Sequence, residues 1–392
     1  VATLNDGPNL RPVGTYVLGQ PTNGGGIRNY PYTTNITANP LTYQHMGLGA
    51  VPPWLFSNGS EVHNIGEIWC AALWEMTWGI IQQQGTINQN IYDFTPATPG
   101  GNSIALKLVM EGMKLQPCSP GFLDARNAIL TADKNLYGGS HQCAIWTAFA
   151  KRGMGYSAIQ GSSSSTTDQT AAFDLPPAPN ITGQPSDVTV AVGGTANFTV
   201  TATAPVNGAF ITYKWQVSTN GGATWNDIVP FVTTPTLTLT GVTAGMNGNK
   251  YRCILQQGCL TTTSAVATLT VSVPAGFTFN SPAPVVSNCP APASMTSTNL
   301  TATYFGGHTA NINLTASGNP GGTTVTFSTN PLTTGSTSTT VTLNNTNTLA
   351  PGSYVITVTG TSAGAATQTR DITFTINPGT GPSITAQPDD QT

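Results

Sequence analysis

The chain has 392 residues, which is enough for two or three domains that each bury a core. Only 7% of its residues are charged and its formal net charge is −3, whereas globular proteins average roughly 25% charged residues. This composition excludes a basic nucleic-acid-binding surface and long solvated helices. No apolar run approaches the ~18 residues that indicate a membrane span. We therefore expect a secreted or cell-surface protein rich in β structure, with no nucleic-acid partner and no membrane span.

Charge is distributed unevenly along the chain. Residues 1–165 hold 16 charged residues and five of the seven Trp, whereas residues 166–392 hold only 11 charged residues. The change falls in residues 161–177, GSSSSTTDQTAAFDLPP. A run of small polar residues cannot bury apolar surface, so we predict a flexible Ser/Thr-rich linker there. Residues 1–160 are then the first domain.

This first domain is predicted to be mainly helical. Residues 1–60 are rich in Gly, Pro and Asn and show no periodicity, which predicts long loops. Beyond them, apolar residues at helical spacing, bounded by Gly, Pro and Ser, predict four helices. They cover residues 62–83 and 104–115, one opens at Ser119-Pro120 and ends near residue 136, and one begins after Ser140 and ends near residue 152.

Two all-β domains are predicted beyond the linker, over residues 178–273 and 274–378. Short alternating runs separated by turn residues indicate sandwiches. In the first domain, Trp215 stands where an immunoglobulin-like domain keeps its core Trp, and Tyr251 precedes Cys253 by two residues, as in a tyrosine corner. Phe198 takes the place of the usual first Cys. The second domain ends in a predicted hairpin.

A repeat lies at the end of the sequence. PNITGQPSDVT, which starts at Pro179, and PSITAQPDDQT, which starts at Pro382, share seven of eleven positions. The first copy opens a β domain, so we expect residues 379–392 to be a linker and the start of a further truncated repeat. We also expect the sequence, which begins at Val1 without Met, to be a fragment of a longer product.

The chain contains six cysteines, which are Cys70, Cys118, Cys143, Cys253, Cys259 and Cys289. None forms the C-x2-C pair of a zinc knuckle, and disulfides are the default in an exported protein. Cys253 could pair with Cys259 across a hairpin, and Cys118 with Cys143 across a helix. Cys70 is interpreted as a buried thiol, and Cys289 has no evident partner.

The residues alone offer little chemistry. His63 and Glu67 stand at i and i+4 of a predicted helix and could share a metal, but no third ligand follows at a suitable spacing. A His at a helix start and an exposed Glu are the favoured interpretation. His45 and His141 are interpreted as surface or capping residues. The Trp residues of the first helix are interpreted as core residues.

Several segments in order carry a family resemblance: RPVGTYVLGQPTNGGGIRNYPYTTN, EVHNIGEIWCAALWEMTW, GGNSIALKLVMEGMKLQPCSPGFLDARNAILTADKNLYGG and HQCAIWTAFAKRGMGYSA. Over about residues 10–158 the chain closely resembles the C-terminal half of fungalysin-type zinc metallopeptidases, which resemble thermolysin. The resemblance implies a mainly α-helical thermolysin-like C-terminal lobe, here followed by two immunoglobulin-like sandwich domains.

The resemblance also implies site residues. In the family, zinc is held by the two His of H-E-x-x-H and a later Glu, and none of these is present here. Zinc is therefore expected in the intact family and not on this chain alone. A His at a helix start donates a hydrogen bond to the developing oxyanion, and in EVHNIGEIW this is His63. Arg28 in GIRNYPY could hold a substrate carbonyl or could be structural. Tyr30 and Tyr32 could line the cleft, although packing is favoured.

The β domains resemble modules of secreted Bacteroidetes-type proteins, which act as spacers or adhesive surfaces. No platform of exposed aromatic residues for sugar binding is evident, because Trp215 is expected in the core and Trp225 in GGATWND is the one surface candidate that remains.

Two functional hypotheses follow. In the first, the chain is a fragment of a secreted zinc endopeptidase that acts on peptides or proteins. It supplies the oxyanion-side lobe plus β-sandwich spacers, is completed by the missing N-terminal half, and is inactive alone. In the second, it is a non-catalytic cell-surface structural or adhesive protein that retains a degenerate peptidase lobe.

Overall fold

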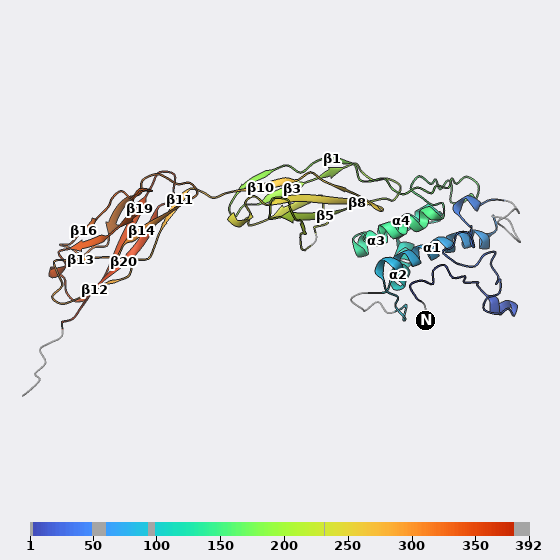
Figure 1. Cartoon of the computed structure of the whole chain (residues 1–392), viewed down its shortest axis with the longest axis horizontal. Helices are drawn as coiled ribbons and strands as arrows, with labels where there is room; N and C mark the ends of the chain where they lie inside the picture. The colour runs from blue at the N-terminus through green and yellow to red at the C-terminus, as the bar shows by residue number, and fades with distance from the viewer. Residues whose placement is uncertain (1–2, 49–59, 93–98, 231, 380–392) are drawn as a thin grey trace, which may run out of the picture. The chain divides into compact units, whose positions relative to one another are not determined.

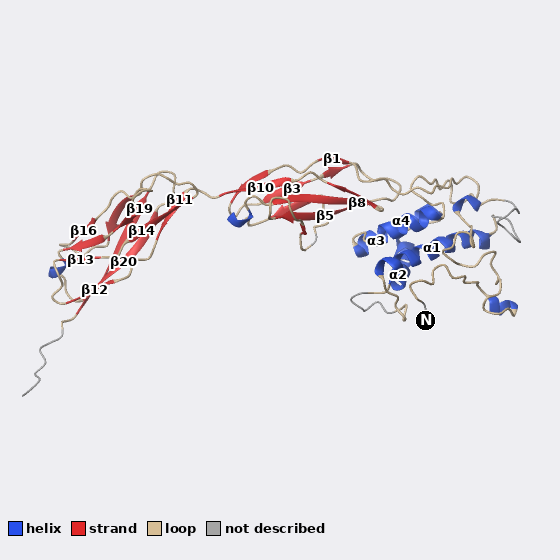
Figure 2. Cartoon of the chain, viewed as in Figure 1, coloured by secondary structure: helices blue, strands red, loops and turns tan. Residues whose placement is uncertain are grey.

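The computed structural model describes residues 3–48, 60–92, 99–230 and 232–379. A helical part precedes two β domains along the chain, as predicted (Figure 1, Figure 2). The chain forms two compact units. The first comprises the helical part and most of the first β domain, and the second comprises two short segments of the first β domain and all of the second β domain.

The helical part contains the four predicted helices, and long loops precede them. The helices are α1 (Val62–Gln84), α2 (Gly101–Leu115), α3 (Phe122–Tyr137) and α4 (Gln142–Lys151), and the short 3-10 turns η1 (Thr15–Leu18) and η2 (Tyr43–His45) interrupt the loops. Gly85 and Gly138 end α1 and α3 in the left-handed conformation that glycine adopts without strain. None of these helices is long and apolar enough to cross a membrane.

The helix α1 starts at Val62 as predicted, and the starts of α2, α3 and α4 differ from the predicted ones by one to three residues. Gly121, not Ser119, precedes α3, and His141, not Ser140, precedes α4. The start of α2 lies at Gly101, three residues before the first apolar residue of the pattern. Apolar periodicity marks only the part of a helix that is packed, so polar and glycine residues of the first turn carry little signal.

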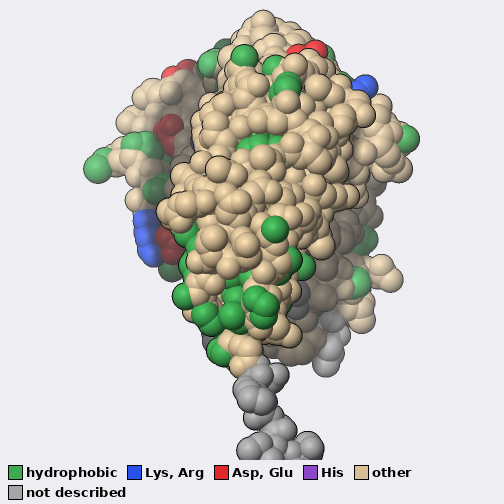
Figure 3. Space-filling view, turned by 90° about the vertical axis from the view of Figure 1, so that its left-hand side faces the viewer, with side chains coloured by type: hydrophobic (Ala, Val, Ile, Leu, Met, Phe, Trp, Pro, Cys, Tyr) green, Lys and Arg blue, Asp and Glu red, His purple; other side chains and the backbone are tan. Residues whose placement is uncertain are grey.

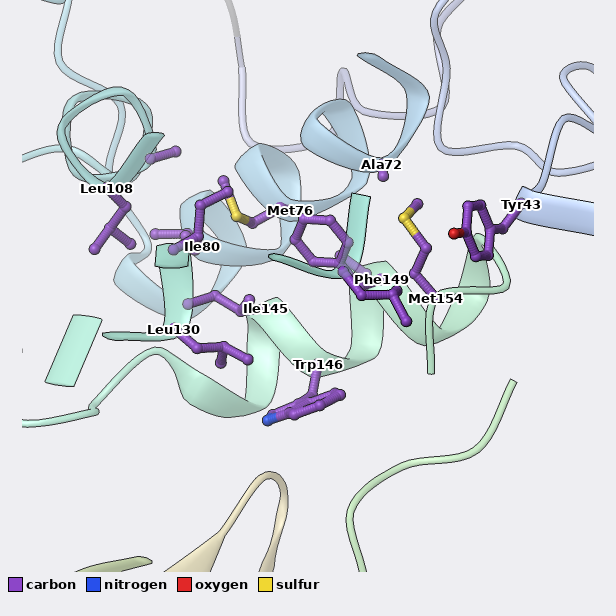
Figure 4. Packing of buried hydrophobic residues seen from close by; sticks show 14 of the residues in the cluster. Tyr43, Ala72, Met76, Ile80, Leu108, Leu130, Ile145, Trp146, Phe149 and Met154 are labelled. Carbon is purple, nitrogen blue, oxygen red and sulfur yellow. The ribbon is translucent and has the colours of Figure 1, made fainter. Parts of the chain in front are cut away.

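The core of the helical part lies among all four helices (Figure 4). Met76 and Ile80 of α1 lie in one cluster with Ile145 and Phe149 of α4. The predicted role of the Trp residues of α1 in packing is confirmed, because Trp78 is buried and Trp69 packs against Phe122 and Phe149 at ring-centroid distances of 5.3 and 5.6 Å.

The loops before α1 are held on the helices by a buried guanidinium group. Arg152, which is 0% exposed, donates to the carbonyl oxygens of Thr33, Asn39 and Leu41 at 3.1, 2.7 and 3.0 Å. It also donates to Oε1 of Glu75 in α1 at 2.7 Å. Burial lowers the pKa of Arg152, and the carboxylate of Glu75 opposes that shift.

The first β domain contains three sheets, with orders β2–β10–β8–β5–β6, where β9 also pairs with β8, β3–β7 and β1–β4. Phe198 of β3 stacks on Tyr251 of β8 at 4.7 Å. Trp215 lies opposite Cys253 and is buried, as predicted. The strands are β1 (Ile181–Gly183), β2 (Val188–Ala191), β3 (Ala196–Thr199), β4 (Thr201–Ala202), β5 (Ile211–Ser218), β6 (Asn226–Asp227), β7 (Thr236–Leu239), β8 (Lys250–Gln257), β9 (Leu260–Thr263) and β10 (Ala267–Ser272).

The second β domain has three sheets, β11–β14–β17, β12–β20–β19–β15 and β13–β18–β16. The predicted terminal hairpin is β19–β20, and β12 pairs parallel to β20. Uncharged side chains dominate the face seen in Figure 3. The strands are β11 (Gly276–Phe279), β12 (Val285–Asn288), β13 (Ser294–Thr296), β14 (Leu300–Phe305), β15 (Asn313–Ser317), β16 (Thr324–Phe327), β17 (Ser338–Thr339), β18 (Val341–Asn344), β19 (Gly352–Thr361) and β20 (Gln368–Asn377).

Both predicted disulfides are wrong. Cys143 pairs with Cys259, which is 116 residues away in sequence, with 4.4 Å between their Cα atoms. Cys253 is buried inside the first β domain, and Cys118 is exposed. Cys70 is half-buried rather than fully buried, and Cys289 is exposed. Spacing along the chain does not reveal a pair that tertiary contact brings together.

The predicted linker, residues 161–177, makes specific contacts with the helical part. Thr170 bridges to Ile159 through two backbone hydrogen bonds, and Gly155 donates to the carbonyl oxygen of Ala172 at 2.7 Å. Gln169 donates to the carbonyl oxygen of Met46, also at 2.7 Å. Because the side chains of residues 161–177 are mostly small or polar, the backbone N–H and C=O groups of this segment can pair with those of the helical part. The repeat predicted in residues 379–392 lies, apart from its first residue, outside the described residues.

We expect Arg152→Met to destabilise the helical part by about 3–5 kcal/mol, because it leaves three carbonyl groups buried without their donor and removes one of the two cations that pair with Glu75. Urea unfolding followed by far-ultraviolet circular dichroism measures the change. Arg11→Met is the matched control, because the side chain of Arg11 is 48% exposed, and we expect it to change stability by about 0.5 kcal/mol or less. Equal stability of the two variants would contradict the anchoring role of Arg152.

Candidate functional site

His63 lies in the first turn of α1, where Glu61 caps the helix. One oxygen of Glu61, Oε2, accepts hydrogen bonds from the backbone N–H groups of His63 at 2.9 Å and Asn64 at 3.2 Å. The other oxygen, Oε1, lies 2.6 Å from Nδ1 of His63. The hydrogen bond from the His63 side chain is the main reason that the pKa of Glu61 is lowered. The carboxylate therefore satisfies the helix start and holds the imidazole ring at once.

The contact with Glu61 determines which nitrogen of His63 remains for a further hydrogen-bond partner. An ionised carboxylate only accepts hydrogen bonds, so Nδ1 of His63 must carry a proton. When the ring is doubly protonated, Nε2 is a second donor. The side chain is 67% exposed, so the ring does not belong to the helical core. The arrangement therefore presents a charge-assisted donor at the surface.

Arg28 lies close to His63 because hydrogen bonds of its neighbour Asn29 hold the loop against α1. The backbone N–H of Asn29 donates to Oε1 of Glu67 at 2.7 Å, and its side-chain Nδ2 donates to Oε2 of Glu67 at 3.2 Å. The same Nδ2 donates to Oδ1 of Asn64 at 2.6 Å. Asn64 follows His63 directly in α1 and Glu67 lies one turn further along it, so these bonds hold the loop that carries Arg28 against that helix.

Together these residues line an open concavity of about 350 Å³. The structure thus brings the two predicted site residues, His63 and Arg28, into one concavity, and it adds three residues that the sequence interpretation missed. These are Asn29, Glu61 and Asn64. Glu is not among the strongly preferred N-cap residues, so Glu61 gave only a weak signal.

The interpretation of Glu67 as an exposed residue is wrong. Its side chain is buried, and its carboxylate is bonded to Asn29. Burial raises the pKa of Glu67, and the hydrogen bonds from Asn29 oppose that shift. A metal shared by His63 and Glu67 is therefore not supported, since Glu67 is turned toward amide donors.

The other candidate residues have structural roles. Tyr32 stacks on Trp74 at 6.1 Å, and burial is the main cause of its raised pKa. Tyr30 is half-buried against the helical core. Nδ1 of His45 lies 3.0 Å from the hydroxyl of Thr42 in the same turn.

Of the two interpretations of His141, a surface or a capping residue, the surface one is wrong, and the residue occupies the N-cap position of α4 without a capping hydrogen bond from its side chain. His141 is 3% exposed, and its Nδ1 lies 2.8 Å from Oδ1 of Asp133. This buried contact joins the end of α3 to the start of α4, which local sequence does not show.

The residues present do not provide a zinc site. Among the residues that the structure describes, no group of three or more His, Cys, Asp or Glu side chains could hold a metal ion. The carboxylates of the concavity are already bonded to His63 and Asn29. We therefore derive no chemical step through a metal on this chain.

Comparisons with known proteins show which family the helical part resembles. Residues 3–158 match the Fungalysin metallopeptidase (M36) family. Over 156 residues the chain is 41% identical to the extracellular metalloproteinase MEP of Fusarium vanettenii, which covers 39% of this chain and 22% of that protein. Over 132 residues it is 46% identical to the extracellular metalloproteinase mep of Aspergillus fumigatus, which covers 33% and 19%. The chain thus spans about a fifth of the length of these relatives, and the predicted fungalysin resemblance is confirmed for this part.

The β domains are less well identified. Residues 181–273 match a domain family of unknown function (DUF8696). Among solved structures, the chain is similar to the crystal structure of DIP-gamma IG1+IG2 at 13% identity, over 51% of this chain and 98% of that chain, with a TM-score of 0.29. This likeness is too weak to identify a fold. The relatives named above are fungal, and the resemblance to Bacteroidetes-type modules stays a prediction.

We expect the buried carboxyl of Glu67 to make stability fall as pH rises. Its pKa is raised in the folded protein, so the folded state keeps a proton that the unfolded state has already lost. Stability therefore decreases from the unfolded pKa, about 4.3, upward through the folded value. Glu67→Gln should remove this decrease. Urea midpoints of both proteins between pH 4 and 7 give the comparison.

The control for this measurement is Glu111→Gln, which removes a carboxylate paired with Lys114 on the surface of α2. A stability difference between wild type and Glu67→Gln that stays constant across the pH range would refute the raised pKa of Glu67.

Proposed function

We propose that residues 3–158 are the oxyanion-side lobe of a secreted metalloendopeptidase that hydrolyses peptides or proteins. The match to the Fungalysin metallopeptidase family and the names of the extracellular relatives support this proposal. The observation that carries it is the exposed His63 ring, held by Glu61 in the concavity that also contains Arg28.

In this proposal, His63 acts on the oxygen of the scissile carbonyl group. That oxygen gains negative charge as water adds to the carbonyl carbon, so a donor at Nε2 stabilises the transition state more than the substrate. Glu61 keeps the ring oriented, because its carboxylate accepts the hydrogen bond from Nδ1, and Nε2 is a donor when the ring is doubly protonated. The donor is thus in place before the charge develops.

Arg28 binds the substrate beside His63. Its guanidinium group has donors in a fixed plane and no acceptor, which suits a peptide carbonyl oxygen. The hydrogen bonds from Asn29 to Glu67 and Asn64 hold the backbone next to Arg28 on the helix of His63. Both donors therefore keep a constant separation, as productive binding of a substrate requires.

The metal that activates water lies, in this proposal, on a part of the intact enzyme outside this chain, together with its ligands. The partner of the lobe is that metal-bearing half, and the chain alone has no peptidase activity. Nothing in the structure specifically favours the alternative of a non-catalytic adhesive protein.

We further propose that the β domains, residues 178–273 and 274–378, are immunoglobulin-like. The buried Trp215, the packing of Tyr251 on Phe198 and the antiparallel sheets of the first domain support this identity there.

The test uses the intact gene product, purified from its source with its metal. We expect His63→Ala to lower kcat/KM for a fluorogenic peptide by about 10²–10³-fold, chiefly through kcat, because the transition state loses its donor. His45→Ala is the control in the same lobe, and it should leave both constants unchanged because His45 lies outside the concavity and its Nδ1 is bonded to Thr42 of its own turn.

Unchanged kinetics in His63→Ala would overturn the role of His63. An intact product that lacks peptidase activity and carries no H-E-x-x-H motif would overturn the enzymatic proposal and favour the adhesive alternative.

A further inference from the structure

The helical part and most of the first β domain lie in one compact unit and contact each other at several points. The disulfide between Cys143, in the first turn of α4, and Cys259, between β8 and β9, is its covalent link. Beside it, Oε1 of Gln142 accepts a hydrogen bond from the backbone N–H of Gly258 at 2.8 Å. Gln142 is 0% exposed, so its side-chain amide is buried against the β domain.

A second contact is apolar. Phe210, which directly precedes β5, is 8% exposed and belongs to the hydrophobic cluster of the helical part. Its ring lies against Gly139, where a Cβ atom would clash with it, and 5.7 Å from the ammonium group of Lys134. Gly139 also has φ +81°, which favours glycine. The segment between α3 and α4 is therefore shaped to receive a side chain of the β domain.

A third contact uses the buried guanidinium group of Arg126 in α3. It donates to the carbonyl oxygen of Asn207 at 3.0 Å, and to those of Met154 and Gly155 at 2.8 and 2.6 Å. Asn207 returns a hydrogen bond from Nδ2 to the carbonyl oxygen of Tyr156 at 3.0 Å. Arg126 is 1% exposed and lies over the ring of Trp146 at 4.5 Å.

These contacts have a common consequence. Removal of the β domain would take Phe210 away and expose the apolar cluster around it to water. It would also remove Gly258, the hydrogen-bond partner of the buried Gln142 side chain, and Asn207, whose carbonyl oxygen accepts a hydrogen bond from Arg126. The face made by α3, α4 and the turn between them is therefore built to be covered, and the same chain supplies the cover.

We propose that the first β domain docks on the α3–α4 face, and that the helical part needs this contact for its stability. The partner that this face recognises is the pair of segments at residues 207–212 and 258–259. The domain is thus not an independent spacer. This inference does not depend on the peptidase proposal, since it concerns stability.

Hydrogen–deuterium exchange of the full chain tests whether this docking stabilises the helical part. We expect Phe210→Ala to accelerate exchange of the amides of α3 and α4 by at least about tenfold, and to lower the thermal midpoint of the helical part by roughly 5–15 °C. Leu260→Ala is the control, because Leu260 adjoins the disulfide in the same hairpin but is 47% exposed. It should leave exchange in α3 and α4 unchanged.

A reciprocal variant separates docking from misfolding of the β domain. Gln142→Ala changes only the helical side, and we expect it to accelerate exchange in β8 and β9. The proposal is overturned if wild-type protein shows separate unfolding transitions for the two parts. It is also overturned if Phe210→Ala leaves exchange in α3 and α4 at the wild-type rate, or if Gln142→Ala leaves β8 and β9 unaffected.

Discussion

The buried ion pair between Arg152 and Glu75 holds together the part of the molecule that carries the candidate site. Residues 3–48 contain almost no regular structure, so their backbone carbonyl groups need partners from elsewhere. Arg152 supplies three of these bonds, and Lys151 beside it donates to the carbonyl oxygen of Thr34 at 2.6 Å and to Glu75 at 2.9 Å. One carboxylate thus compensates two cations that fasten the loops to α1 and α4.

The same physical solution recurs at the concavity. The buried carboxylate of Glu67 takes the backbone and side-chain donors of Asn29, and the loop with Arg28 is thereby placed against the helix start with His63. Glu61 combines helix capping with orientation of the imidazole ring. In a chain with so few charges, most of those in the helical part lie where they organise irregular backbone. The candidate site depends on this organisation, because neither Arg28 nor its neighbours belong to a helix or strand.

The contact between the helical part and the first β domain follows the same rule. Arg126 and Gln142 are buried polar side chains whose partners come from segments more than 80 residues away in sequence. Buried polar groups of this kind make an interface specific, because any other arrangement leaves donors without acceptors. The disulfide between Cys143 and Cys259 then makes the arrangement permanent in an oxidising environment.

Local physics explains what the sequence by itself determined. Apolar periodicity and glycine stops showed the four helices, alternation showed the strands and the β19–β20 hairpin, and ordered family motifs pointed to His63 and Arg28. Each of these signals resides in residues close together in the chain. The tertiary structure alone decided the pairing of Cys143 with Cys259, the burial of Glu67 and His141, and the attachment of residues 161–177. Those outcomes depend on which distant groups meet, and a buried donor or carboxylate finds its partner only after the helices and sheets have packed.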